Sequence, residues 1–205
     1  MTDAAHYGVF IEPEGSLLDA IQTSKLKVAS TIGDQVYLSH PPHCTLYHGM
    51  LAPIKRWSGC ILKAVKKEQA FKTGTVENFA FYDDPLADGG HTIGIRVEKE
   101  PRLMRLQMIV AEAIRPFISD HIDSHESPFA NVEPFKESIE KYHFPFVGDH
   151  WIPHFTISSL AIDKEHPLIV DLLNSKNDFP VAVGKISVWK IDGQEHKKLL
   201  TAHLS

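Results

Sequence analysis

Two short segments of the chain carry the same pattern of residues, His-x-Thr-aliphatic. The first is His43-Cys44-Thr45-Leu46 and the second is His154-Phe155-Thr156-Ile157, so the two histidines are 111 positions apart (154 − 43). An imidazole can accept or donate a proton close to neutral pH. Two imidazoles that converge on one site could therefore serve together as general base and general acid. The repeated pattern predicts an enzyme.

Both motifs follow prolines and begin an apolar stretch, which favours an extended strand. Side chains alternate between the two faces of a strand, so the histidine and threonine of each motif should share one face. The same alternation brings Tyr47 and Ser158 to that face as possible substrate-binding residues. It turns His48 toward the core unless a bulge intervenes, and we expect Cys44 to pack there rather than act as a nucleophile.

The elements around the two motifs follow the same order: strand, helix, strand, strand. In the first half we expect strands at about residues 43–51, 72–82 and 91–98, with a helix that Pro53 opens. In the second half we expect strands at about residues 154–161, 179–191 and 197–204, with a short helix at 167–173. A strand at 7–11, a helix that ends at Gly33 and a helix from about Arg102 to Pro116 complete the set.

This order predicts an α+β fold with two duplicated lobes. Each lobe should be an antiparallel sheet with helices packed outside it, and an active-site cleft should lie between the lobes. We treat residues 1–205 as one domain with pseudo-repeat halves at about 36–118 and 154–205.

The segment between the halves, about 119–153, is long for a connection and rich in aromatic residues. Such a segment could stack a base of the substrate or close over it as a lid, which makes Trp151, Tyr142 and Phe144 possible substrate-binding residues. The other interpretation is a hydrophobic cluster that packs the insertion onto the body of the protein.

The overall composition limits the classes of partner. The chain has 205 residues, a net charge of −5 and a pI near 6.2, so we expect no extensive nucleic-acid surface, although a small nucleotide or an RNA terminus remains compatible. No apolar run approaches the roughly 18 residues of a membrane span, and no secretory signal is visible. Two cysteines make no disulfide framework. We expect a cytoplasmic monomer.

Thirteen histidines could suggest a metal site. His121 and His125 are four positions apart, as are His150 and His154, which is a spacing of metal ligands on a helix. However, neither first histidine is followed by glutamate, and Pro153 interrupts the second pair. We therefore expect no metal and no cofactor.

The paired motifs resemble those of the 2H phosphoesterase superfamily, which includes 2′-5′ RNA ligase-like proteins and 2′,3′-cyclic nucleotide phosphodiesterases. The first motif, with Gly49 after it, and the second motif are both similar to the family's, and the resemblance covers most of the chain outside residues 119–153. It implies metal-independent attack on a phosphodiester. His43 and His154 would be base and acid in either order, and Thr45 and Thr156 would hold the phosphoryl oxygens.

The function that this resemblance implies is hydrolysis of a 2′,3′-cyclic phosphate, either at an RNA end or on a small nucleotide. One alternative is an enzyme that cleaves or forms 2′-5′ linkages in oligonucleotides. Another is a nucleotide- or RNA-binding module without turnover, although such a module has no need of two proton-transfer groups. A histidine-rich metalloprotein is a further alternative, which the ligand spacing disfavours.

Overall fold

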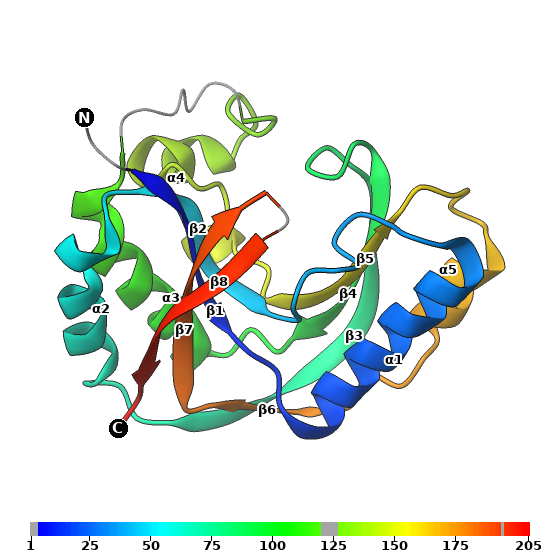
Figure 1. The fold of residues 1–205 in the computed structure, drawn as a ribbon, viewed down its shortest axis with the longest axis horizontal. Coiled ribbons are helices and arrows are strands. Elements are labelled where there is room, and N and C mark those ends of the chain that lie inside the picture. Colours follow the sequence, from blue (N-terminus) through cyan, green and yellow to red (C-terminus); the bar gives the residue numbers. More distant parts are fainter. Residues whose placement is uncertain (1–3, 120–126, 194) are drawn as a thin grey trace.

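Two four-stranded antiparallel sheets form the body of the protein (Figure 1). The computed structural model describes residues 4–119, 127–193 and 195–205. The first sheet has the order β2-β1-β7-β8 and the second has the order β5-β4-β3-β6. The strands are β1 (Ala5–Ile11), β2 (Cys44–Leu51), β3 (Phe71–Asp84), β4 (Gly90–Val97), β5 (His154–Leu160), β6 (Pro180–Val183), β7 (Lys185–Asp192) and β8 (Glu195–His203).

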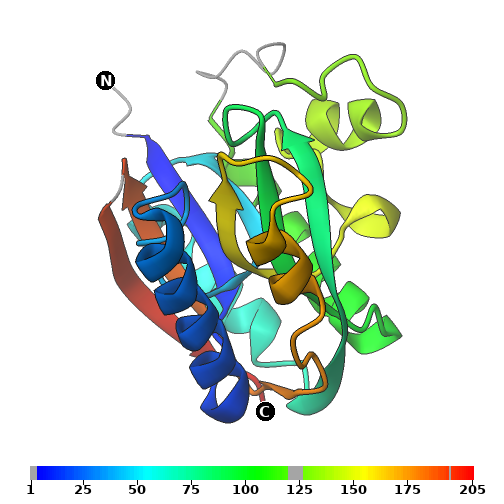
Figure 2. The same cartoon turned by 90° about the vertical axis from the view of Figure 1, so that its right-hand side faces the viewer.

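Helices pack on the outer face of each sheet, as the predicted α+β architecture requires. α2 (Ser58–Val65) and α3 (Pro101–Ile114) contact the first sheet, whereas α1 (Gly15–Ile32) and α5 (Pro167–Leu173) contact the second (Figures 1 and 2). The remaining helices are short: η1 (Ile54–Arg56), η2 (Arg115–Phe117), α4 (Phe135–Tyr142) and η4 (Gly148–His150). The predicted two-lobed fold is confirmed.

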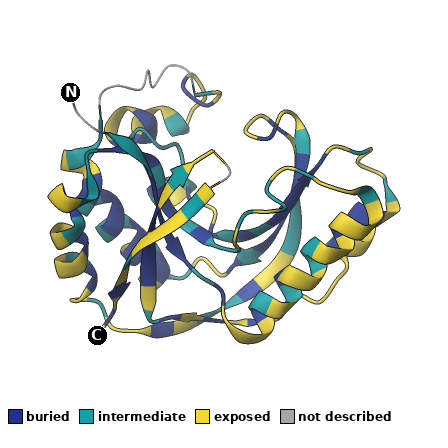
Figure 3. Cartoon of the chain, in the orientation of Figure 1, coloured by how far each residue is buried: buried dark blue, intermediate teal, exposed yellow. Residues whose placement is uncertain are grey.

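Helix boundaries and core faces follow from the sequence pattern. α1 ends where Gly33 adopts a φ of +79° and donates its backbone N–H to Ala29, which confirms the predicted end of that helix. Buried residues lie mainly on the strands and on the inward faces of the helices (Figure 3). In α2, Ile61 and Val65 are fully buried, but Leu62 is 41% exposed and lies outside the apolar stripe of that helix.

Each sheet draws strands from both halves of the chain. β7 and β8 lie beside β1 and β2 in the first sheet, and β3 and β4 lie beside β5 and β6 in the second. The predicted single strand at 179–191 is therefore wrong: it divides at Gly184 into β6, which pairs with β3, and β7, which pairs with β1. The apolar positions change at Gly184 from Val181 and Val183 to Ile186 and Val188, but such a shift around a glycine indicates a bulge as readily as a change of partner strand.

The two motif strands, β2 and β5, are edge strands, and other segments satisfy their outward backbone groups. The Trp151 indole N–H donates to the Thr45 carbonyl at 2.9 Å, and the Gln107 amide donates to the Leu46 carbonyl at 3.2 Å. At the edge of β5, the backbone N–H of Ser159 donates to the Val36 carbonyl at 2.8 Å.

The described part of the insertion, residues 127–153, covers the edge and core side of β2. The possible substrate-binding residues Tyr142, Phe144 and Trp151 all belong to this packing. The Tyr142 carbonyl accepts a hydrogen bond from the Tyr47 hydroxyl at 2.8 Å, and the Phe144 ring lies 5.6 Å from that of Tyr47. Tyr142 and Trp151 are 4% and 2% exposed, so the cluster interpretation describes them better than a lid does.

Replacement of Gln107 by leucine should destabilise the protein. The Gln107 side chain is fully buried, donates to the carbonyls of Leu46 and Phe146, and accepts from the N–H of Gly148. A leucine would leave these groups without a partner, which should lower the free energy of unfolding by about 2–4 kcal/mol in urea titrations. Gln22→Leu, on the exposed face of α1, is the control and should change it by less than about 0.5 kcal/mol. Equal midpoints for the two variants would contradict the role of Gln107.

Candidate functional site

The two motifs meet where β2 and β5 begin. These strands are in contact, and the buried Cys44 thiol lies against the backbone of His154. His43 and His154 are close enough for the charge of one to influence the other. The histidines and their threonines, Thr45 and Thr156, are all partly exposed. The structure thus brings all four predicted residues together, whereas Cys44 is buried as strand alternation predicted.

Both motif histidines are held in the same way. The Nδ1 atom of His43 lies 2.7 Å from the carbonyl oxygen of Pro41, and the Nδ1 atom of His154 lies 2.7 Å from that of Ile152. A carbonyl can only accept, so each Nδ1 carries a proton and donates it. This arrangement leaves Nε2 as the atom that gains or loses a proton in each ring.

An aromatic ring from the same sheet packs against each histidine: Phe10 comes from the adjacent strand β1, and Phe79 comes from β3, across Gly94 of β4. Phe10 lies 4.1 Å from His43 between ring centroids, and Phe79 lies 5.4 Å from His154, edge to face. A glycine makes room for each ring: a Cβ atom at Gly8 would overlap the Phe10 ring, and one at Gly94 would come within 2.9 Å of the Phe79 ring. These aromatic contacts fix the orientations of both imidazoles and keep water from one side of each.

A β-bulge follows the first motif and changes which residues face the site. Val9 pairs with Tyr47 and Phe10 pairs with Thr45, so Leu46 is the additional residue on β2. After the bulge, Tyr47 points into the core, where it is fully buried, and His48 points to the same side as His43. The expectation that Tyr47 shares the face of His43 is therefore wrong. His48 does not point toward the core, because the bulge that could change its direction is present.

The second motif contains the equivalent bulge. Gly94 pairs with Thr156 and Ile93 pairs with Ser158, so Ile157 is the additional residue on β5. Ser158 consequently leaves the motif face, is fully buried, and donates its hydroxyl to the Val36 carbonyl at 2.8 Å. The predicted placement of Ser158 on the motif face is wrong for the same reason as that of Tyr47. Ser159 takes the position on the motif face instead.

The strand pairing adds a charged residue that the sequence did not indicate. Arg96 on β4 lies directly opposite His154 on β5, so the two side chains share one face of the sheet. The Arg96 guanidinium lies 5.1 Å above the Phe79 ring and 3.2 Å from a carboxylate oxygen of Glu77. Only the register of β4 against β5 reveals this proximity, because 58 positions separate Arg96 from His154 (154 − 96).

The surroundings hold both motif histidines in the neutral form. Burial is the main cause that lowers the pKa of His43 to about 4, and the nearby imidazoles of His196 and His40 act in the same direction. Burial also lowers the pKa of His154 and Arg96 adds to that effect, whereas the Ile152 carbonyl opposes it. An anionic ligand between the two rings would raise both pKa values.

The structure offers few alternatives to this site. No three of the His, Cys, Asp and Glu side chains in the described ranges gather in a way that could hold a metal ion. His121 and His125 lie outside those ranges, and His150 packs against Phe135. Within the same ranges, no helix has the length and apolar character needed to cross a membrane.

A comparison with models of protein families identifies the family of this chain. The model of the 2′-5′ RNA ligase superfamily matches residues 13–195, a range that includes both motifs. The chain belongs to this superfamily. It is a superfamily of 2H phosphoesterases and RNA ligase-like proteins, which are in general enzymes, and the resemblance that the paired motifs carry is thus confirmed. A comparison with curated proteins gives no match.

Several solved structures share the fold of this superfamily member. TT0787 of Thermus thermophilus has a TM-score of 0.60 at 13% sequence identity, and the match covers 97% of each chain. LigT of E. coli in its apo form has a TM-score of 0.54 at 11% identity over 98% of each chain. A protein described as a phosphoesterase has a TM-score of 0.54 at 15% identity over 99% of each chain.

The position of His48 predicts a loss of stability in acid. Burial, followed by the charges of His6 and His43, lowers the pKa of His48 to about 3, from an ordinary value of 6.5. As pH falls below 6.5, the unfolded chain binds a proton at this residue that the folded protein does not, so the free energy of unfolding falls. Between pH 7 and pH 5 this loss should reach about 2 kcal/mol in urea titrations.

His48→Gln should make the fall in stability between pH 7 and pH 5 smaller by about 2 kcal/mol, because glutamine does not titrate, whereas His43 and His154, whose pKa values are also lowered, should still contribute. The control is His203→Gln, since His203 is an exposed residue of β8. The stability of the control should fall between pH 7 and pH 5 as steeply as that of the unmodified protein. An equally steep fall in His48→Gln would show that His48 is not the group responsible.

Proposed function

We propose that this protein is a metal-independent phosphodiesterase that opens a cyclic phosphodiester, a 2′,3′-cyclic phosphate on a small nucleotide or an RNA end. The observation that carries the proposal is the equivalent setting of His43 and His154. Both Nδ1 atoms are fixed at 2.7 Å from a backbone carbonyl, so the Nε2 atom of each ring remains for proton transfer. The solved complexes of E. coli LigT with phosphate and with 3′-AMP also support this substrate class.

The proposed reaction balances with these residues and water alone. A neutral imidazole takes a proton from water while the water oxygen attacks phosphorus. The bond from phosphorus to the 2′ or 3′ oxygen breaks, and the second imidazole, protonated at Nε2, donates its proton to that oxygen. The product is a nucleoside monophosphate, and the two histidines have exchanged protonation states. Water then restores the starting state.

The threonines and the bound anion complete this scheme. Hydroxyl groups of Thr45 and Thr156 lie on the same faces as the histidines and would donate hydrogen bonds to the non-bridging phosphoryl oxygens. The negative charge of the substrate raises the pKa of a nearby imidazole. Substrate binding thereby supplies the protonated histidine that burial disfavours in the free protein.

His43→Ala and His154→Ala should each lower kcat/KM for a 2′,3′-cyclic mononucleotide by at least about 10³-fold, because each removes one proton-transfer group. The assay should contain a chelator, and circular dichroism and urea midpoints should show that both variants fold. His166→Ala is the matched control: His166 caps α5, so its replacement should leave kcat/KM within about twofold. Activity in either motif variant close to that of the unmodified protein would exclude the paired-histidine mechanism, as would complete loss with the chelator.

The value of kcat/KM should be highest on the acid side of pH 6.5. The pKa of His43 is lowered to about 4 and that of His154 is also lowered, so the free protein holds one protonated and one neutral imidazole only below pH 6.5. As pH rises above 6.5, the protonated partner is lost and kcat/KM should fall about tenfold per pH unit. The measurement is a pH series with a 2′,3′-cyclic mononucleotide. A maximum above pH 8 would contradict the electrostatic description of the site.

A further inference from the structure

A row of three paired residues crosses the second sheet at the start of the second motif. Glu77 of β3 pairs with Arg96 of β4, and Arg96 pairs with His154 of β5. Side chains that are paired in this way lie on one face of the sheet, about 5 Å apart at Cβ. The charge of the Arg96 guanidinium is felt at the neighbouring imidazole, because it adds to the effect of burial in lowering the pKa of His154.

The next row brings the threonine of the motif within reach of Arg96. Gly94 of β4 pairs with Thr156, and Gly94 precedes Arg96 by two positions, so Arg96 is a diagonal neighbour of Thr156 on the same face. A diagonal separation of about 7–8 Å is within reach of a long side chain. A phosphoryl oxygen that accepts a hydrogen bond from the Thr156 hydroxyl would therefore lie where Arg96 can donate to it as well.

The Arg96 guanidinium is held in position but retains unused donors. It lies 5.1 Å above the Phe79 ring, and its Nη1 atom is 3.2 Å from a carboxylate oxygen of Glu77. A guanidinium has five N–H groups, and within the described residues the buried Nε atom of Arg96 has no hydrogen-bond partner. The side chains of Arg96 and Glu77 are 40% and 54% exposed, so their ion pair is weak and a ligand can reach the guanidinium.

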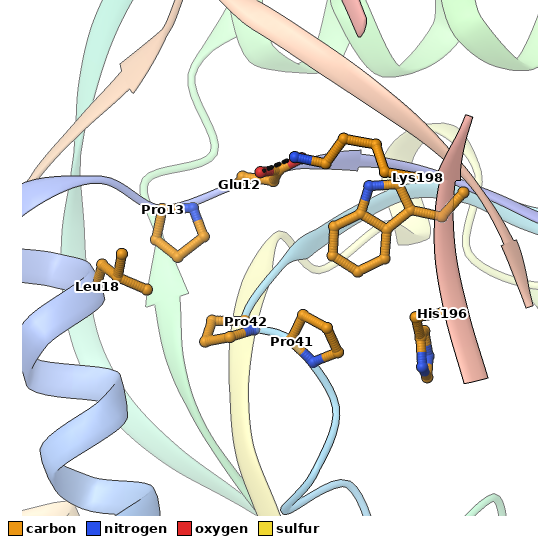
Figure 4. Close-up of a pocket in the computed structure, with 8 residues that line it drawn as sticks. Glu12, Pro13, Leu18, Pro41, Pro42, His196 and Lys198 are labelled. Carbon is orange, nitrogen blue, oxygen red and sulfur yellow. Dashed lines mark hydrogen bonds and ion pairs between the residues drawn. The ribbon is translucent and has the colours of Figure 1, made fainter. Parts of the chain in front are cut away.

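A lysine on the His43 side of the site is held differently. Lys198 of β8 contacts both carboxylate oxygens of Glu12 at 2.7 Å, on the wall of a hollow beside the first motif (Figure 4). The whole carboxylate thus neutralises its ammonium, which is a point charge without a planar fork. The guanidinium of Arg96 has a fork that matches two oxygens of a phosphate. Arg96 is therefore better suited than Lys198 to bind a phosphoryl group.

The proposed reaction requires a positive charge near the phosphoryl oxygens. The cyclic phosphodiester carries one negative charge, and the attacking water adds a second as it loses its proton to an imidazole. The non-bridging oxygens share this charge in the transition state, where aligned donors are most effective. The hydroxyl groups of Thr45 and Thr156 are neutral donors, whereas a hydrogen bond from a guanidinium is charge-assisted and about twice as strong.

We propose that Arg96 is a catalytic residue of this enzyme, whose guanidinium donates to a non-bridging phosphoryl oxygen and stabilises the charge that develops there as water attacks. The inference rests on the proposed function and adds a third kind of group to the two histidines and two threonines. Phe79 and Glu77 position the guanidinium for this contact.

Arg96→Met and Arg96→Lys test the proposal without changing a residue of the motifs. Methionine removes the charge but keeps an unbranched side chain that packs well on an aromatic ring, and lysine keeps the charge without the planar fork. The control is Arg102→Met, because the Arg102 guanidinium also lies above a ring, at 4.7 Å from that of Phe71, and Arg102 is an exposed residue of α3 outside the two rows. Urea midpoints should show that all three variants fold.

The value of kcat should be compared at the pH optimum of each variant, which removes the effect of Arg96 on the protonation of His154. Arg96→Met should lower kcat for a 2′,3′-cyclic mononucleotide by at least about 10²-fold and change KM by less than about fivefold, because the contact strengthens in the transition state. Arg96→Lys should recover about tenfold of that loss, and Arg102→Met should leave both constants within about twofold. A kcat of Arg96→Met within about threefold of that of the unmodified protein, or a loss confined to KM, would overturn the catalytic role and leave the proposed function standing.

Binding of inorganic phosphate separates the contact from the reaction, because the phosphate dianion carries two negative charges without being a substrate. In calorimetric titrations, the unmodified protein and Arg102→Met should bind the dianion equally, and Arg96→Met should bind it at least about tenfold more weakly. If the unmodified protein hydrolysed no cyclic phosphate but showed this pattern, the proposed function would fail and the contact of Arg96 with a phosphoryl group would stand. Equal binding by Arg96→Met and the unmodified protein would overturn that contact.

Discussion

The candidate site depends on two edge strands that each contain a bulge one residue after the motif threonine. An edge strand has backbone groups that no neighbouring strand satisfies, and a bulge adds an unpaired residue. Here side chains take over that role, and Gln107 and Trp151 satisfy the carbonyls of Leu46 and Thr45. The motif strands therefore remain at the edges of their sheets, where they contact each other, and the two lobes contribute equivalent halves of the site.

Burial and backbone hydrogen bonds act on the motif histidines in opposite directions. Burial favours the neutral imidazole, whereas a carbonyl at Nδ1 favours the protonated ring. No carboxylate makes a described hydrogen bond or ion pair with His43 or His154 within the ranges that the structure covers. Asp84 acts to raise the pKa of His154 but burial outweighs it, so an anionic ligand such as a phosphodiester would add charge that stabilises the imidazolium.

The sequence was sufficient for the motifs, the α+β class, the position of most elements and the cap at Gly33, because these follow from local spacing and backbone preference. It was insufficient wherever pairing with a segment distant in the sequence decides the direction of a side chain or the partner of a strand. Alternation alone put Tyr47 and Ser158 on the motif face, but a bulge depends on the pairing of two strands and moves both residues into the core. Similarly, Arg96 acquires its place opposite His154 only through register, and the division at Gly184 reflects a change of partner strand.

The exchange of strands between the lobes has a consequence for how this protein folds. In the first sheet, His6 pairs with Ile191, so 185 positions separate residues that share a ladder (191 − 6). Closing so long a loop costs conformational entropy before the contacts that stabilise the sheet have formed. Folding rates accordingly fall as native contacts become less local. Because β1 lies between β2 and β7, the strand that begins directly after His43 gains its full support only after β7 has docked. The histidine pair should therefore assemble late in folding, after the local helices and hairpins.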